Sequence, residues 1–266
     1  MAPMPWLLSV LVKQKEVVSG DNTSKSLVED LMRRCYNVFG KKGATIMDKN
    51  FTIKQRTQFD EERARRMLRY VYPEKYDDAV LSDAPDIVCE KLDIGVEVTS
   101  GLRQDILQDI SRAASISGKM DDELTKIDRV NIEKERVLSL HTGSGMNLAA
   151  TWATWGNTFD HKTILRKKCQ KLNKPHFRVF NHNELFIFAW LIDQDELDEA
   201  IEYIASKKWI ADDAQYSFDT IYVFDDKILT EIVVDGMRVV RHTIPSFIMH
   251  LISNKAYKAV TCNGKK

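Results

Sequence analysis

Two acidic residues in the most strongly patterned part of the sequence could hold a metal ion together. Asp86 begins an apolar run at residues 86–89, and Glu97 lies eleven positions later in a second apolar run at residues 94–99. The two runs, separated by a short polar turn, predict a β-hairpin. Asp86 and Glu97 can therefore converge across it, and Thr99 lies on the same strand face as Glu97. Paired carboxylates suit Mg²⁺ or Mn²⁺, which would activate water and offset charge during phosphodiester hydrolysis.

Helix and strand patterns alternate after this hairpin. Residues 161–174 predict a helix with a basic face, which Pro175 would end. The continuous apolar run at residues 184–192 predicts a buried, central strand. Asp193 and Glu196 match a capping box, which predicts a further helix directly after that strand.

The C-terminal part of the chain shows a second hairpin signal. Residues 220–224 predict another buried strand. Asp235 and Gly236 lie between apolar alternations at residues 232–240, which is the strongest short-range hairpin pattern. A last helix is predicted at residues 245–254.

The upstream part is predicted to be mainly helical. Residues 22–39 have helical spacing of apolar positions behind a cluster of capping residues. Residues 54–70 form a charged segment whose end, residues 61–70, predicts a polar helix. Glu61 and Glu62 stand with four arginines there, so a salt-bridged surface helix is favoured over a DNA footprint. The charged stretch at residues 100–160 is interpreted as an insertion.

The hairpin residues resemble those of the PD-(D/E)xK, or restriction-endonuclease-like, nuclease superfamily. The resemblance lies in Pro85-Asp86 and in the run Gly95-Val96-Glu97-Val98-Thr99. Downstream, the basic segment at residues 164–172 and the apolar strand after it resemble the helix and fourth core strand that follow this motif. The resemblance implies a mixed central sheet flanked by helices and a metal-dependent nuclease activity.

The resemblance also implies roles for individual residues. Asp86 and Glu97 would hold Mg²⁺ or Mn²⁺, with the carbonyl of Val98 as a third ligand. Glu29, on the leading helix, would contact the metal or its water. Ser26 stands three positions before Glu29, so a capping box explains that glutamate about as well.

The sequence departs from the family pattern at one position. Thr99 stands where the family usually has the lysine that positions or activates the attacking water. Some relatives supply a basic or amide group from the following helix, and four residues there are candidates: Lys167, Lys168, Gln170 and Lys171. Lys168 and Lys171 are the two expected to stabilise charge on the phosphate. If none of the four faces inward, the fold would persist without hydrolysis.

Ordinary structural readings compete with these functional ones. Asp86 after a proline is typical of a turn, and Glu97 could be an exposed strand residue. The basic helix could simply be a solvated face. His141 and the glycines after it lack nucleotide-cradling spacing. The tryptophans and the aromatic residues of the 184–192 strand are more typical of a core than of base stacking.

Composition narrows the class of protein. The 266 residues contain 39 basic and 39 acidic residues, so any site for a polyanion must come from a local patch. Four scattered cysteines fit neither a disulfide framework nor a zinc ribbon, which favours the cytoplasm. The apolar run at residues 6–12 is too short to cross a bilayer and is expected to be a packing segment or a first strand, so we expect no membrane association.

Together these patterns predict one α/β domain over residues 1–266. Its core would occupy about residues 24–224, with a mixed sheet of four or five strands, a helical insertion at about residues 100–160, and a C-terminal hairpin and helix at residues 228–254. The expected function is Mg²⁺- or Mn²⁺-dependent cleavage of nucleic acid, with DNA favoured and a homodimer as one arrangement for cutting a duplex.

Two alternatives stay open. The first is a catalytically silent module of the same fold that serves binding, regulation, defence or counter-defence. The second is an unrelated α/β domain that binds a ligand or a protein, in which Asp86 and Glu97 would lie apart.

Overall fold

The computed structural model describes most of the chain from residue 53 onward: residues 53–134, 138–141, 147–150, 159–189, 192–225 and 227–263. The predicted helix at residues 22–39, with Glu29, and the apolar run at residues 6–12 lie outside the described residues, as do Trp152, Trp155 and Trp190.

A seven-stranded mixed sheet forms the centre of the structure, in the order β1-β2-β3-β6-β7-β8-β9. The strands β3, β6 and β7 run parallel, and all other neighbours are antiparallel. The bounds are β1 (Val80–Leu81), β2 (Ile87–Cys89), β3 (Ile94–Ser100), β6 (His182–Phe188), β7 (Thr220–Asp225), β8 (Ile228–Val233) and β9 (Arg238–Thr243).

The predicted α/β class and mixed sheet are confirmed, but the expected four or five strands were too few. The difference arises because the C-terminal hairpin does not stand apart: β8 pairs with β7 and extends the same sheet. The hairpin at residues 85–99 is also confirmed, with β2 antiparallel to β3. Its turn is a short 3₁₀ helix, η2 (Glu90–Leu92), followed by Asp93 in the left-handed region at φ 53°.

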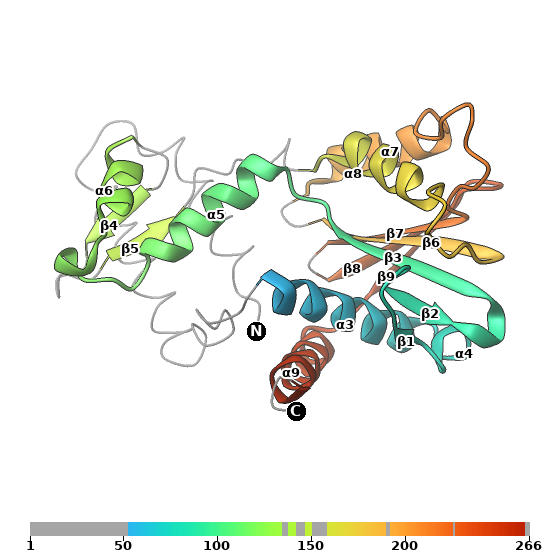
Figure 1. Cartoon of the computed structure of the whole chain (residues 1–266), viewed down its shortest axis with the longest axis horizontal. Helices are drawn as coiled ribbons and strands as arrows, with labels where there is room; N and C mark the ends of the chain where they lie inside the picture. The colour runs from blue at the N-terminus through green and yellow to red at the C-terminus, as the bar shows by residue number, and fades with distance from the viewer. Residues whose placement is uncertain are drawn as a thin grey trace.

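Helices cover both faces of the sheet (Figure 1). One layer consists of α7 (His161–Leu172) and α8 (Gln194–Ala205), and the other contains α3 (Ile53–Val71), α4 (Pro73–Tyr76) and α9 (Ser246–Asn263). The alternation of side chains along β6 fills both cores, because Leu185 and Ile187 face α7 and α8 whereas Phe186 and Phe188 face α3 and α9. This central position confirms that the apolar run of β6 is a core strand.

The helix α3 corrects one expectation. Salt bridges do join Glu62 to Arg65 and Arg66, as the charge pattern predicted. The helix does not lie on the surface, however, because Ala64, Met67 and other residues of its apolar stripe are fully buried between the sheet and α9. The many charged residues around these apolar positions made the whole helix resemble a surface helix in the sequence.

The other helices follow their sequence signals closely. Asp193 and Glu196 form the predicted capping box at the start of α8. Asp160 caps α7 by accepting a hydrogen bond from the backbone N–H of Thr163. The last helix, α9, continues well beyond the predicted end at residue 254. Within the described ranges, no helix combines the length and the apolar character needed to cross a membrane.

A separate substructure leaves the sheet after β3. It departs at Leu102 and returns at Phe159, and these two residues form an antiparallel bridge. Between them lie α5 (Gln104–Ile116), η3 (Asp121–Glu123), α6 (Lys126–Glu133) and a two-stranded sheet of β4 (Leu138–His141) and β5 (Asn147–Ala150). The insertion is therefore not purely helical. It lies to one side of the main sheet (Figure 1).

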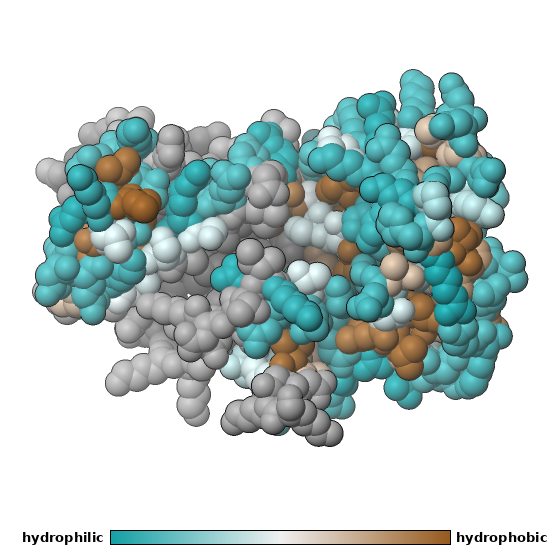
Figure 2. Space-filling model, viewed as in Figure 1, coloured by the Kyte–Doolittle hydropathy of each residue, from teal (hydrophilic) through white to brown (hydrophobic). Residues whose placement is uncertain are grey.

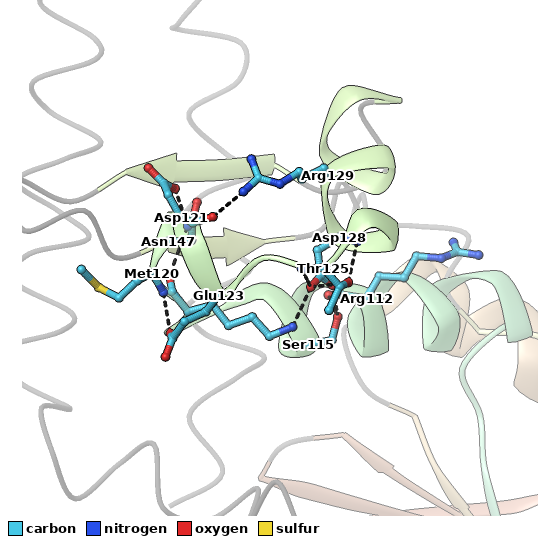
Figure 3. Close-up of polar contacts among 10 residues, drawn as sticks. Arg112, Ser115, Met120, Asp121, Glu123, Thr125, Asp128, Arg129 and Asn147 are labelled. Carbon is cyan, nitrogen blue, oxygen red and sulfur yellow. Dashed lines mark hydrogen bonds and ion pairs between the residues drawn. The ribbon is translucent and has the colours of Figure 1, made fainter.

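Polar contacts hold the parts of this insertion together (Figure 3). The buried carboxylate of Asp128 accepts hydrogen bonds from the hydroxyl of Thr125 at 2.8 Å and from Lys119 Nζ at 2.6 Å. Asn147 on β5, which is also buried, donates to the carboxylate of Asp121 at 2.9 Å. These contacts join α6, η3 and β5 within the insertion.

The absence of a side chain at Gly95 lets Phe180 and Pro85 pack closely against β3. A Cβ atom there would lie 2.6 Å from Phe180 Cδ2 and 2.7 Å from Pro85 Cγ. Because Pro85 immediately precedes Asp86, this contact also places the acidic residue.

We expect Gly95→Ala to lower the free energy of unfolding by about 2 kcal/mol, since the new methyl group must displace two rings. Urea denaturation would measure the change. The comparison variant is Gly236→Ala, where no atom lies within 4 Å of the new Cβ and only the positive φ of 80° opposes it. That variant should lose about 1 kcal/mol, and an equal or smaller loss at Gly95 would contradict the packing argument.

Candidate active site

The site lies at an open edge of β3. The strand β2 is shorter than β3, and its first residue, Ile87, pairs with Val96. Residues 97–100 of β3 therefore pair only with β6 in the described part of the chain. Asp86, directly before β2, uses this edge: its Oδ2 atom accepts a hydrogen bond from the backbone N–H of Val98 at 2.7 Å. Asp86 and Glu97 therefore come together, contrary to the expectation of the second alternative reading.

Glu97 is a buried carboxylate with two lysine partners. Its side chain is only 2% exposed, on the side of the sheet that α7 covers. Lys168 Nζ donates to the Oε1 atom at 2.7 Å, and Lys171 Nζ donates to the same oxygen atom. Lys168 Nζ also lies 3.3 Å from the carbonyl oxygen of Val98. The open strand edge and the helix thus converge on one carboxylate.

The geometry of α7 decides which of its basic residues face the site. Leu165, Cys169 and Leu172 are buried against the sheet. Lys168 and Lys171 border this apolar stripe and reach Glu97, whereas Lys167 and Gln170 are exposed. Of the four residues that the sequence offered as the basic or amide group, only Lys168 and Lys171 therefore face the acidic residues. On the face shown in Figure 2, hydrophilic residues cover most of the α7 and α8 layer.

The remaining cations of this region fit a solvated helix face. Lys162 pairs with Glu199 on α8 at 2.5 Å. The guanidinium of Arg166 lies 5.8 Å from the ring centroid of Tyr203. The hydroxyl of Thr99 donates to the backbone carbonyl of Ser100 at 3.4 Å.

Glu97 has one oxygen atom that its surroundings leave unused. Oε2 is buried, and it has no hydrogen-bond partner among the described residues. Glu184 on β6 provides a comparison, because it is also 2% exposed but uses both oxygen atoms, one with Lys75 at 2.6 Å and one with the hydroxyl of Tyr76. Both oxygen atoms of Glu184 have partners, whereas Oε2 of Glu97 can still accept a hydrogen bond or bind a cation.

Sequence reasoning missed Glu61 on α3, which joins this group of acids. Burial, followed by the nearby charges of Asp86 and Glu97, raises the pKa of its carboxyl to about 7. The charge spacing could have indicated this. Glu62 pairs with Arg65 and Arg66 at i+3 and i+4, so Glu61, one position earlier, must face a different side of the helix. The leading-helix acid was instead sought at Glu29.

Burial and like charge also act on Asp86. Burial, followed by repulsion from Glu97, raises the pKa of Asp86 to about 6, although the N–H of Val98 and the two lysines oppose this shift. The raised pKa values of Asp86 and Glu61 therefore come first from burial, to which the neighbouring carboxylates add.

The oxygen atoms at the edge fit a hard divalent cation. Among the described residues there is no group of three or more His, Cys, Asp or Glu side chains arranged to hold a metal ion. The fit therefore depends on two carboxylates, Asp86 and Glu97 with its unpartnered Oε2, together with the backbone carbonyl of Val98. Such a set suits Mg²⁺, which binds through one or two carboxylates and completes its shell with water and phosphate.

No protein-family model, curated protein or solved structure matches this chain.

We expect Glu61→Gln to stabilise the protein above pH 7 but not below pH 4.5. The folded state raises the pKa of Glu61 from 4.5 to about 7, so the folded state holds a proton that the unfolded state releases across this interval, and stability falls as the pH rises. The gain at pH 8 should be about 1 kcal/mol, after allowance for the partly exposed side chain.

Thermal unfolding in a chelating buffer from pH 4 to pH 8.5 would measure this gain. The matched control is Glu74→Gln, at an exposed position of α4. A gain of the same size at both ends of the pH range would contradict the assignment of Glu61 to the acid group.

Proposed function

We propose that this protein is a divalent-metal-dependent nuclease of restriction-endonuclease-like fold. The observation that carries the proposal is the position of Lys168, which comes from the helix after the hairpin and contacts both Glu97 and the carbonyl of Val98. This places an ammonium group beside the acidic pair even though Thr99 replaces the usual lysine.

The order of elements supports the fold part of the proposal. Helix α3 precedes the antiparallel hairpin β2–β3, and the basic helix α7 then leads to β6, which pairs parallel to β3. The family resemblance of the sequence implies the same succession of hairpin, basic helix and core strand. The additional strands β7, β8 and β9 extend the sheet on the side away from the site.

The residues of this chain would divide the chemistry as follows. Asp86, Glu97 and the carbonyl of Val98 would hold Mg²⁺ or Mn²⁺, which when bound supplies Lewis acidity and a water molecule of lowered pKa. Lys168, fixed at two points, would orient the attacking water through its N–H donors. Lys171 would stabilise the negative charge that develops on the phosphate.

The substrate we propose is nucleic acid, with DNA favoured. The phosphate backbone supplies the anion that a site of lysines and a divalent cation would bind. Lys174 is exposed directly after α7, where it would contact a neighbouring phosphate. A homodimer would bring two such sites to a duplex, and the cytoplasm would be the compartment.

One observation favours a second candidate, a catalytically silent nucleic-acid-binding module. Lys168 and Lys171 both pair with Glu97, so the protein's own cations can offset the charge of this carboxylate. Such a module would bind nucleic acid through α7 and would not cleave it.

We expect cleavage of DNA or RNA in Mg²⁺ or Mn²⁺ to fall about 100-fold or more in Asp86→Asn and in Glu97→Gln, because each removes a charged oxygen ligand. Lys168→Met should lose about 10- to 100-fold through loss of a donor. A panel of single- and double-stranded substrates would measure these rates, with every variant purified identically.

Lys167→Met is the matched control, since Lys167 is a neighbouring lysine whose side chain is exposed. Its cleavage rate should equal that of the wild type. Metal-independent cleavage, or equal cleavage by Asp86→Asn and the wild type, would contradict the nuclease proposal. Tight binding without cleavage would favour the silent module.

A further inference from the structure

Two ammonium groups share one oxygen atom of Glu97, which is more than the carboxylate needs. Lys168 and Lys171 both donate to Oε1. The second oxygen, Oε2, is buried, and no residue in the described part of the chain hydrogen-bonds to it. Two cations on one atom repel each other, so the arrangement suggests that one of them is not required for folding.

The two lysines differ in how firmly they are held. Lys168 has a second contact, at 3.3 Å to the carbonyl oxygen of Val98, and its side chain is 21% exposed. Lys171 is 38% exposed, and its ammonium group lies 5.4 Å from the ring centroid of Phe177. It also stands in the last turn of α7, where the helix dipole favours a cation near solvent. Lys171 is therefore the partner that can leave.

The charges indicate when it would leave. Asp86 and Glu97 together carry two negative charges when ionised, and the two lysines carry two positive charges, so the site is balanced without a metal ion. A divalent cation on the same carboxylates adds two positive charges next to both ammonium groups. The repulsion is relieved when the more exposed ammonium group moves away.

We propose that Lys171 is an internal competitor of the metal ion: it holds Glu97 when no divalent cation is bound and is displaced towards solvent when one binds. This inference rests on the proposed function, because it requires that Asp86 and Glu97 bind a divalent cation. It adds that the chain itself sets the affinity of this site. The released ammonium group would then be free to meet an incoming phosphate, which links metal loading to substrate binding.

Titration calorimetry with Mn²⁺ alone, on the full chain and without nucleic acid, tests the competition. Lys171→Met should bind Mn²⁺ about tenfold more tightly than the wild type, because it removes the competing charge. Lys171→Arg keeps the charge and should bind as the wild type does. Lys167→Met, at an exposed position of the same helix, is the matched control and should leave the affinity unchanged.

A second measurement uses the wild-type chain and so does not depend on how a variant folds. The rates at which an acetylating reagent labels individual lysines, read by mass spectrometry, should rise for Lys171 when Mn²⁺ is added. The rate for Lys168, held by the carbonyl of Val98, should change much less.

The outcomes separate this inference from the proposed function. Mn²⁺ binding by the wild type with no tighter binding by Lys171→Met, or with no change in the labelling of Lys171, would overturn the competitor role and leave the metal site standing. Failure of the wild type and of every variant to bind Mn²⁺ would overturn both. Tighter binding by Lys171→Met together with faster labelling of Lys171 would support it.

Discussion

The neutralisation of one buried carboxylate is the interaction on which this end of the structure depends. Glu97 lies in the middle of a core strand with almost no exposure to solvent. An isolated charge at such a position would destabilise the fold by several kcal/mol. The helix α7 resolves this conflict by bringing two lysines onto the carboxylate while its apolar stripe packs on the sheet. The same contacts that permit burial also concentrate opposite charges at the strand edge.

The unequal lengths of two strands make this edge accessible. Because β2 ends at the level of Val96, the polar groups of Val98 are left for side chains to use. Asp86 takes the N–H group and Lys168 approaches the carbonyl group. An edge strand with free polar groups is usually protected from other chains. Here side chains from the hairpin and from α7 provide the protection and form the candidate site at the same time.

Two buried glutamates on adjacent parallel strands differ in how fully their oxygen atoms are hydrogen-bonded. Glu97 faces the layer of α7, while Glu184 faces α4 and binds Lys75 and Tyr76. The network of Glu184 uses every oxygen atom and joins α4 to the sheet. The network of Glu97 leaves Oε2 unused. The two glutamates are therefore equally buried but differ in hydrogen bonding. The one with an unpaired oxygen atom, Glu97, lies at the open edge of β3.

The sequence by itself determined the local elements and the two acids, because both depend on interactions between near neighbours. Two short apolar runs and the polar turn between them specified the hairpin that carries Asp86 and Glu97. The Asp193–Glu196 pair likewise specified the start of α8. Helical spacing restricted the basic group to α7 but could not orient it, since the rotation of a helix about its axis is fixed only by what it packs against.

Tertiary structure decided the rest. Packing on β3 turned Lys168 and Lys171 inward and left Lys167 exposed. Glu61 joined the acids because α3 is buried between the sheet and α9, which its charged sequence did not reveal. The sheet reached seven strands because β8 paired with β7. Each of these outcomes depends on contacts between segments far apart in the chain, and no local pattern of residues encodes such contacts.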